Sequence, residues 1–449
     1  MPIAGLSRWT ATYFALALLA LVVAQVMLAA GFGYPGDDFM APETLIVVHL
    51  VAIGWLTLLM CGALFQFVPV LVAGRQDNDW HAPLALLLLV LGLAVLLMGF
   101  AGLAGLPGGD AEALPLGGVV LTAGFLVVVA KLARIIWAAR PLAPPARFVL
   151  VGLAGLVLTG LLGESLAAAL TGLLPDDMAM ALVAAAVPVH AASGLGGWLT
   201  VTAIGVSYRL LSMFLLAPEP KGWRSRVAFW ACLVAVALLA AHGIAIALAL
   251  PLPPAPVLIV TAGSLAVAFY AADFVQLYRT RKRRQLELHS KAALAAFAAL
   301  IGGALLLLAG IAGIGARMVP AAVYVLSFGW LGGLGLAMLY KIVPFLTWLE
   351  CFAPVMGRQP TPRVQDLVRE TQAAPWFWLY FLAVAIATAA LAADLPLVFQ
   401  AAMAVQVLGT VLLIREFYRS RRLANIPGDL WTGDRPRLFL PKLFEENHV

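Results

Sequence analysis

The sequence has little charge for its length. Only 11% of its 449 residues are Asp, Glu, Lys or Arg, whereas water-soluble domains carry about a quarter. Hydrophobic residues make up 63%, and the mean hydropathy is +1.00. This composition excludes a soluble globular protein.

Cysteines and the common catalytic motifs are also scarce. Cys61, Cys232 and Cys351 stand singly, with no CxxC pair, so they indicate neither a disulfide framework nor a zinc site. No Walker sequence or HExxH is present, and no GxGxxG or GxSxG stands in a credible setting. The chemistry of a soluble enzyme is therefore not expected.

Long apolar runs follow one another along the whole chain. A spanning helix needs about 20 mainly apolar residues, and the alternating segments of a β-barrel are missing. We predict an all-α polytopic membrane protein of about twelve transmembrane helices, near 9–33, 43–73, 82–106, 116–139, 146–172, 183–216, 227–250, 254–279, 291–314, 319–347, 374–393 and 396–418.

Basic residues fall on one side of this layout. One connection on that side carries the run Arg279 to Arg284, whereas the opposite loops hold a single basic residue, Arg317. The positive-inside rule predicts a bacterial inner-membrane protein with both termini in the cytoplasm, loops 34–42 and 107–115 outside, and loop 280–290 inside. Topology and contact with anionic membrane lipids explain the net charge of +6, so no nucleic-acid partner is expected.

Three spans share one spacing of residues, counted from Trp55, Trp198 and Trp330. A small residue stands at +7, an aromatic at +10, a polar residue at +11 and Pro or Ser at +14. Because these spans are four apart, they predict three pseudo-symmetric four-helix units around one axis, roughly 1–140, 141–280 and 281–423, before a cytoplasmic tail at 424–449. The even number of spans between copies favours parallel units over inverted repeats.

Two of these spans resemble helices of a known family. The stretch from His49 to Pro69, ending Gly-Ala-Leu-Phe-Gln-Phe-Val-Pro, resembles the second helix of the haem-copper oxidase catalytic subunit and the related nitric oxide reductase large subunit. The stretch from Tyr324 to Pro344 resembles the tenth helix of that family. The resemblance implies twelve helices in three arcs, with cofactor histidines on the second, sixth, seventh and tenth.

The sequence departs from that family at several ligand positions. The two tenth-helix histidines correspond to Ala322 and Tyr324, and only His242 stands where the seventh helix has an adjacent pair for copper. A complete oxygen-reducing centre is therefore not expected. If the protein is an enzyme, the resemblance implies an oxidoreductase of the haem-copper oxidase or nitric oxide reductase type.

Four candidate ligands share one depth in the membrane. At about 1.5 Å per residue, His49, His190 and Tyr324 lie about 30 Å, and His242 about 24 Å, from the cytoplasmic ends of their helices, all in the external third of the bilayer. Histidine is costly there without a partner, and imidazole is a common ligand of haem iron and copper. The remaining histidines fall in predicted cytoplasmic segments: His81, His289 and His448.

The resemblance makes His49 an axial ligand of a b-type haem. Tyr324 is then a weaker axial partner or a hydrogen-bonding group, and Trp55 and Trp330 either border the cofactor or only pack in the core. Each histidine taken alone also fits a structural bond to a neighbouring helix.

Two further groups are candidates for the site. His190 with His242 is predicted to form a copper-like or second haem site. Glu164 stands alone in the fifth span, where a carboxylate must be protonated, paired or reached by water. It is therefore either a proton relay or a bond to a partner helix.

Two hypotheses of function follow. The first is a haem-binding membrane protein that transfers electrons, or handles or senses a small gas such as nitric oxide or oxygen, with a cytochrome or a quinol as electron donor. The alternative is a transporter, metal-handling protein or assembly factor on the same scaffold, with the cofactor sites lost. The sequence leaves the oligomeric state open.

Overall fold

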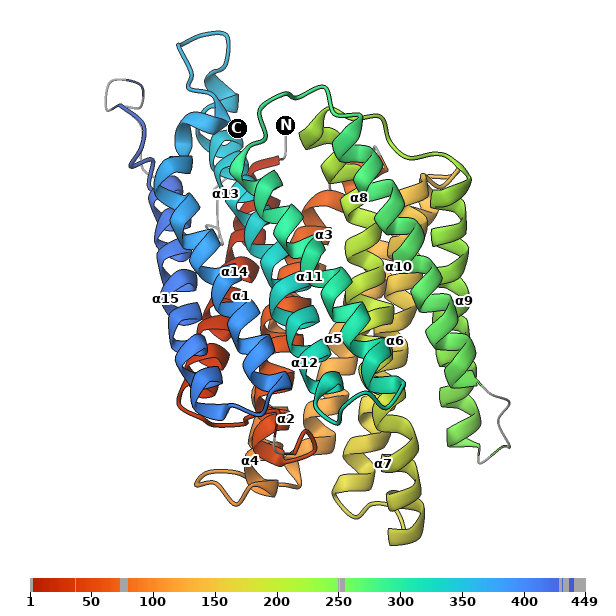
Figure 1. Ribbon diagram of the computed structural model, residues 1–449. Coiled ribbons are helices and arrows are strands. Elements are labelled where there is room, and N and C mark those ends of the chain that lie inside the picture. The colour runs from red at the N-terminus through yellow and green to blue at the C-terminus, as the bar shows by residue number, and fades with distance from the viewer. Residues whose placement is uncertain are drawn as a thin grey trace.

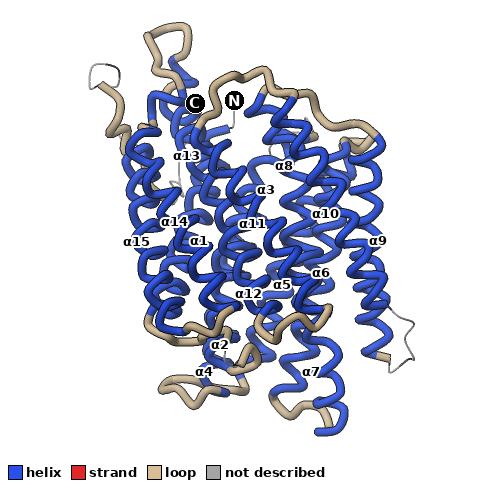
Figure 2. Tube along the Cα trace, in the orientation of Figure 1, coloured by secondary structure: helices blue, strands red, loops and turns tan. Residues whose placement is uncertain are grey.

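The computed structural model describes residues 3–36, 38–72, 80–248, 250, 255–427, 430 and 436–439, with side chains from residue 9 onward. His448 and most of the predicted tail 424–449 lie outside these residues. Helices make up nearly all of the part that the structure describes, and they form one bundle (Figures 1 and 2).

Twelve helical stretches in the described residues are long and apolar enough to cross a membrane, which confirms the predicted all-α fold of about twelve spans. Nine are single helices: α1 Ile3–Ala29, α4 His81–Leu103, α5 Ala113–Ala138, α6 Pro144–Leu170, α9 Trp223–Ala247, α10 Ala255–Arg279, α11 Leu288–Ile311, α14 Glu370–Ala392 and α15 Pro396–Arg421.

The second, sixth and tenth spans each consist of three consecutive segments. They are α2 Pro42–His49, η1 Leu50–Thr57 and α3 Leu58–Leu71; α7 Asp176–Ala191, η2 Ala192–Thr200 and α8 Val201–Leu215; and α12 Met318–Tyr324, η3 Val325–Gly332 and α13 Gly333–Cys351. Two short 3₁₀ helices, η4 Ala353–Val355 and η5 Val364–Leu367, lie between α13 and α14.

The sixth span begins earlier than the sequence predicted, at Asp176 instead of residue 183. Pro175 precedes it, and Asp176 and Asp177 occupy its first turn. Proline and acidic residues both suit the start of a helix, because the first N–H groups need no helical partner and carry partial positive charge. The helix therefore extends past its apolar run, and α7 projects from the bundle (Figure 1).

The start of α1 and the end of α15 lie at the same end of the bundle, together with the α10–α11 connection (Figure 1). The α1–α2 and α4–α5 connections lie at the opposite end. The loops at 34–42 and 107–115 are therefore separated from the loop at 280–290 by the length of the bundle, as the odd number of spans between them requires. Which end faces the cytoplasm stays a prediction.

Glycines let α4 and α5 approach each other closely. A Cβ atom added at Gly92 would lie 2.7 Å from the backbone nitrogen of Leu121, and one at Gly117 would lie 2.5 Å from that of Leu96. Small residues at such contacts are the usual means of helix packing in lipid, where van der Waals contact replaces the hydrophobic driving force.

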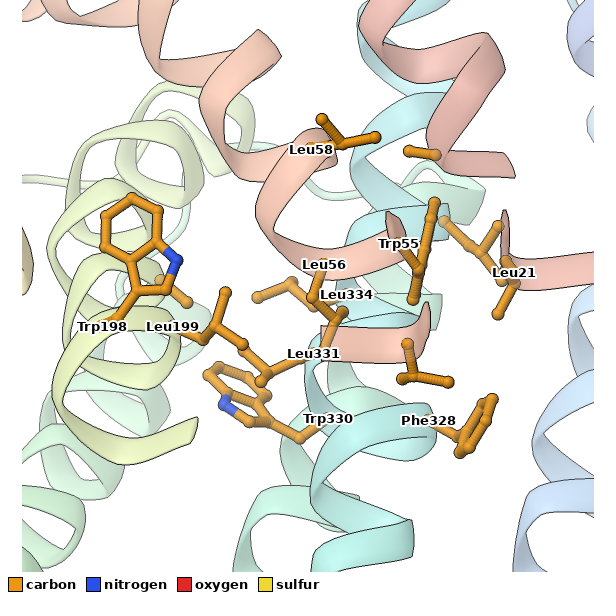
Figure 3. Close-up of a cluster of buried hydrophobic side chains, with 14 of the residues drawn as sticks. Leu21, Trp55, Leu56, Leu58, Trp198, Leu199, Phe328, Trp330, Leu331 and Leu334 are labelled. Atoms are coloured by element: carbon orange, nitrogen blue, oxygen red, sulfur yellow. The ribbon is translucent and has the colours of Figure 1, made fainter. Parts of the chain in front are cut away.

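The middle segment of each three-part span is a π-helix, η1, η2 or η3. Each ends two residues after the repeat tryptophan, Trp55, Trp198 or Trp330, and all three indole side chains are fully buried. Figure 3 shows these tryptophans in one apolar cluster. π-Helical turns are rare and often occur at functional sites, so a shared position in three spans supports the predicted repeat.

Side chains satisfy backbone carbonyls that the π turns leave available. Thr200 donates a 2.8 Å hydrogen bond to the carbonyl of Leu195 in η2, and Tyr380 of α14 donates one of 2.7 Å to that of Phe328 in η3. An unpaired carbonyl is costly in a membrane, so these hydroxyl groups stabilise the distorted turns.

Each three-part span has an equivalent set of neighbours. The second span packs against α1, the sixth against α6 and the tenth against α11. The helices α4 and α5, α9 and α10, and α14 and α15 form close pairs, and α15 also packs against α1. The unit boundaries at residues 140 and 280 stay a prediction.

Candidate functional site

His49 is the last residue of α2, directly before the π-helix η1. Its ring Nδ1 lies 2.7 Å from the carbonyl oxygen of Leu45, one turn earlier. The ring also packs against Phe100 of α4, with 4.8 Å between the ring centres. Figure 1 places α2 and α7 at the end of the bundle away from the chain termini.

His190 lies beside His49 and comes from α7 of the sixth span. The ring centres are 6.3 Å apart, with 30° between the ring planes. The Nδ1 atom of His190 lies 3.1 Å from the carbonyl oxygen of Thr159 on α6. A Cβ atom at Gly163 would lie 3.1 Å from Cε1 of His190, so glycine leaves room for the ring against α6.

The partners of the two imidazoles determine their protonation pattern. A backbone carbonyl only accepts hydrogen bonds, so we assign the proton of each neutral ring to Nδ1. Nε2 of His49 and of His190 then carries a free lone pair. Metal-binding histidines are oriented in this way, with the second ring nitrogen donating to a carbonyl or carboxylate.

His242 lies on α9 and is half-buried. Its Nδ1 is buried and has no hydrogen-bond partner within the described residues. The ring contact of His190 is with His49, and the predicted copper-like pairing of His190 with His242 stays a prediction.

Glu164 lies on α6, next to Gly163. Its Oε2 atom is buried without a hydrogen-bond partner among the described residues. It lies against α5, where a Cβ atom added at Gly118 would be only 2.2 Å from it. The carboxyl group therefore occupies the space that this glycine leaves, and its role as a proton relay stays a prediction.

Tyr324 is the last residue of α12 in the tenth span, and its side chain is buried. Its hydroxyl donates a 2.6 Å hydrogen bond to Oε1 of Gln406 and lies 3.1 Å from Sδ of Met403, both on α15. Phe328 and Phe399 pack against its ring. The partners of Tyr324 thus differ from those of His49, and its predicted role as an axial partner of a haem stays a prediction.

The repeat tryptophans contact neighbouring spans, and the predicted place of Trp55 and Trp330 beside a cofactor stays a prediction. Trp198 donates from Nε1 to Oγ1 of Thr57 across 3.1 Å. Trp330 packs against Tyr270 of α10, with 6.2 Å between the ring centres. Nε1 of Trp55 and Nε1 of Trp330 are buried without hydrogen-bond partners in the described part of the chain.

Comparison with known proteins supports the architecture. No protein-family model matches the sequence, and no curated protein matches it. A haem-copper terminal oxidase, solved as a dimer by cryo-EM, matches the structure with a TM-score of 0.59 over 97% of this chain and 85% of that chain, at 12% sequence identity. The chain has a haem-copper-oxidase-like fold.

This fold confirms the resemblance at the level of architecture, and the ligands have to be judged from this chain's own residues. Within the described ranges, no group of three or more His, Cys, Asp or Glu side chains is arranged to hold a metal ion. The pair His49 and His190 is therefore the best-formed candidate site. The membrane depth counted from the sequence predicted that these two side chains lie at one level, but not that their rings are adjacent.

Proposed function

We propose that His49 and His190 together hold a transition-metal cofactor, and that the protein uses it for electron transfer or for handling a small gas in the membrane. The observation that carries this proposal is the pair of adjacent imidazoles, 6.3 Å apart between ring centres, each with Nδ1 bonded to a carbonyl oxygen. Metal bonds from imidazole nitrogen are about 2.0–2.1 Å long, so two imidazoles on opposite sides of one metal ion have ring centres about 6 Å apart, and the spacing of this pair matches that arrangement.

The cofactor class follows from the ligand type and the fold. Neutral imidazole suits haem iron and copper, and the neighbouring structure is that of a haem-copper oxidase. We propose haem b as the first candidate and copper as the second. When bound, either group supplies a one-electron redox centre. The chain supplies the imidazole ligands, holds them through the carbonyls of Leu45 and Thr159, and packs Phe100 against the ring of His49.

The proposed setting is the bacterial inner membrane, with both chain ends in the cytoplasm and the histidine pair near the external face. The basic run from Arg279 to Arg284 lies in the connection at the end of the bundle that also holds the chain ends. A cytochrome or a quinol is the proposed electron donor. The histidine pair lies toward the opposite end, where an external donor has the shorter path.

The test is an absorption spectrum and a metal analysis of the purified full-length protein. Cells supplied with haem and copper should yield protein with a Soret band or with bound copper, and His49→Ala and His190→Ala should each lose it. His81→Ala is the matched control, because His81 begins α4 at the other end of the bundle and stacks on Trp80. Wild-type protein without haem and copper, or single variants that retain both, would exclude this site.

The second candidate is a membrane protein without redox chemistry on the same scaffold. The bond between Tyr324 and Gln406 favours it, because the resemblance implies a haem ligand at that position. A spectrum without a Soret band, from protein free of copper, is its expected result.

A further inference from the structure

A partly open apolar cavity of about 80 Å³ lies among the second, sixth and tenth spans. Its lining side chains come from equivalent positions of the three repeats. Leu56, Leu199 and Leu331 each follow directly after the repeat tryptophan, and all three line the cavity. Figure 3 shows these leucines converging beside the tryptophans.

Three more sets of lining residues repeat this equivalence. Counted from the tryptophans, they stand at +5, +8 and +12: Met60, Ala203 and Gly335; Ala63, Val206 and Met338; Phe67, Leu210 and Ile342. The offsets +1, +5, +8 and +12 fall on one face of an α-helix. Each central span thus turns one face toward the shared axis, and the cavity lies on that axis.

The cavity offers water almost nothing to bond. Ser207 has the only polar side chain among the lining residues. Its hydroxyl donates to the carbonyl of Ile204 at 2.8 Å and lies 2.8 Å from the hydroxyl of Tyr270, so its bonding capacity is largely used. An ordered water needs two to four polar partners, so the lining holds no water in a fixed position.

Small side chains at two of the levels leave the space open. At +5, Met60 is accompanied by Ala203 and Gly335, and at +8, Val206 and Met338 are accompanied by Ala63. Packed protein interiors contain few voids larger than a water molecule. The void therefore results from small residues at symmetric positions where another copy of the repeat carries a large one.

We propose that this axial cavity is a binding site for a small uncharged apolar molecule, of the size of a diatomic gas. An apolar cavity of about 150 Å³ in another protein binds benzene or xenon, and this one is smaller. The site lies apart from the histidine pair, so the inference stands whether or not a metal is bound there.

Xenon is the probe for this proposal. Crystals of the full-length protein under xenon pressure are expected to show one xenon atom on the axis, between the +5 and +8 levels. Ala203→Met copies the side chain of Met60 into the same level, and should abolish that site. Ala404→Met adds the same side chain to an exposed position on α15, and should leave xenon bound.

A milder variant covers the case in which Ala203→Met does not fold. Ala63→Val copies Val206 and should lower the xenon occupancy at least several-fold. The proposal is overturned if wild-type crystals show no xenon on the axis, or if the folded cavity variant binds xenon as well as Ala404→Met does. Soret absorption and copper content play no part in this outcome, so it separates from the test of the histidine pair.

Discussion

Nε1 of Trp198 donates a 3.1 Å hydrogen bond to Oγ1 of Thr57, which joins the sixth span to the second. Thr57 stands two residues after Trp55. Trp55 in turn points to the tenth span, because a Cβ atom at Gly332, two residues after Trp330, would lie 3.4 Å from its Nε1. Each of these two indoles thus reaches the same repeat position on the next span.

Thr57→Val should destabilise the protein by about 1–3 kcal/mol, because it leaves the buried N–H of Trp198 without an acceptor. The measurement is the thermal unfolding midpoint in detergent. Thr57→Ser keeps the hydroxyl group and should lose much less stability. A loss in Thr57→Ser with none in Thr57→Val would show that the methyl group of Thr57 matters and the hydrogen bond does not.

Tyr380→Phe should lower the free energy of unfolding by a similar amount, about 1–3 kcal/mol, since the carbonyl of Phe328 in the π-helix η3 loses its hydroxyl donor. Tyr418 is half-exposed on α15, and Tyr418→Phe is the matched control with no expected loss. Chemical unfolding of both variants in parallel checks this. A tolerated Tyr380→Phe would mean that water or a backbone shift replaces the hydroxyl.

Glycine substitutions should separate close helix contacts from open faces. Gly92→Ala and Gly117→Ala place a methyl group 2.7 Å and 2.5 Å from backbone nitrogen, and we expect each to lower the unfolding midpoint. Gly263→Ala and Gly302→Ala meet nothing within 4 Å, and should stabilise by about 0.5–1 kcal/mol, because alanine favours the helix. If the variants at Gly92 and Gly117 were more stable than those at Gly263 and Gly302, the close α4–α5 packing would be contradicted.

Cysteine labelling tests the orientation of the bundle. In a background without the three native cysteines, Glu112→Cys should react with a membrane-impermeant maleimide added to intact spheroplasts, because it lies in a predicted external loop. Lys282→Cys should react only after the membrane is opened. Both positions are exposed, so accessibility alone does not distinguish them. The opposite result would place the chain ends outside.

The architecture was predictable because a lipid bilayer allows few backbone conformations. Backbone groups without water must pair within helices, so apolar runs of sufficient length predicted the twelve spans, and the offsets from Trp55, Trp198 and Trp330 predicted which spans correspond. The starts of helices were less predictable: α7 begins with Asp176, which belongs to no apolar run.

The candidate site was predictable only in depth. Counting residues placed His49 and His190 at one level, but the count does not give the direction of a side chain around its helix. The partner of Tyr324 is Gln406, 82 positions away on α15, and no local pattern in the sequence marks that residue. Such partners depend on how distant helices pack, which one sequence does not contain.

The π-helical segments have a mechanical consequence for the second and sixth spans. In an α-helix, each residue is rotated about the helix axis by a fixed angle from the residue before it. A π-helical turn rotates less per residue, so the helical parts before and after it are out of phase. His49 and His190 precede the lag, and the +5, +8 and +12 levels of the axial cavity follow it. Deleting one residue within η1 or η2 would restore the regular helical phase. It would also rotate His49 or His190 about the helix axis relative to the cavity. The orientation of each histidine is thus set by a single residue of chain length.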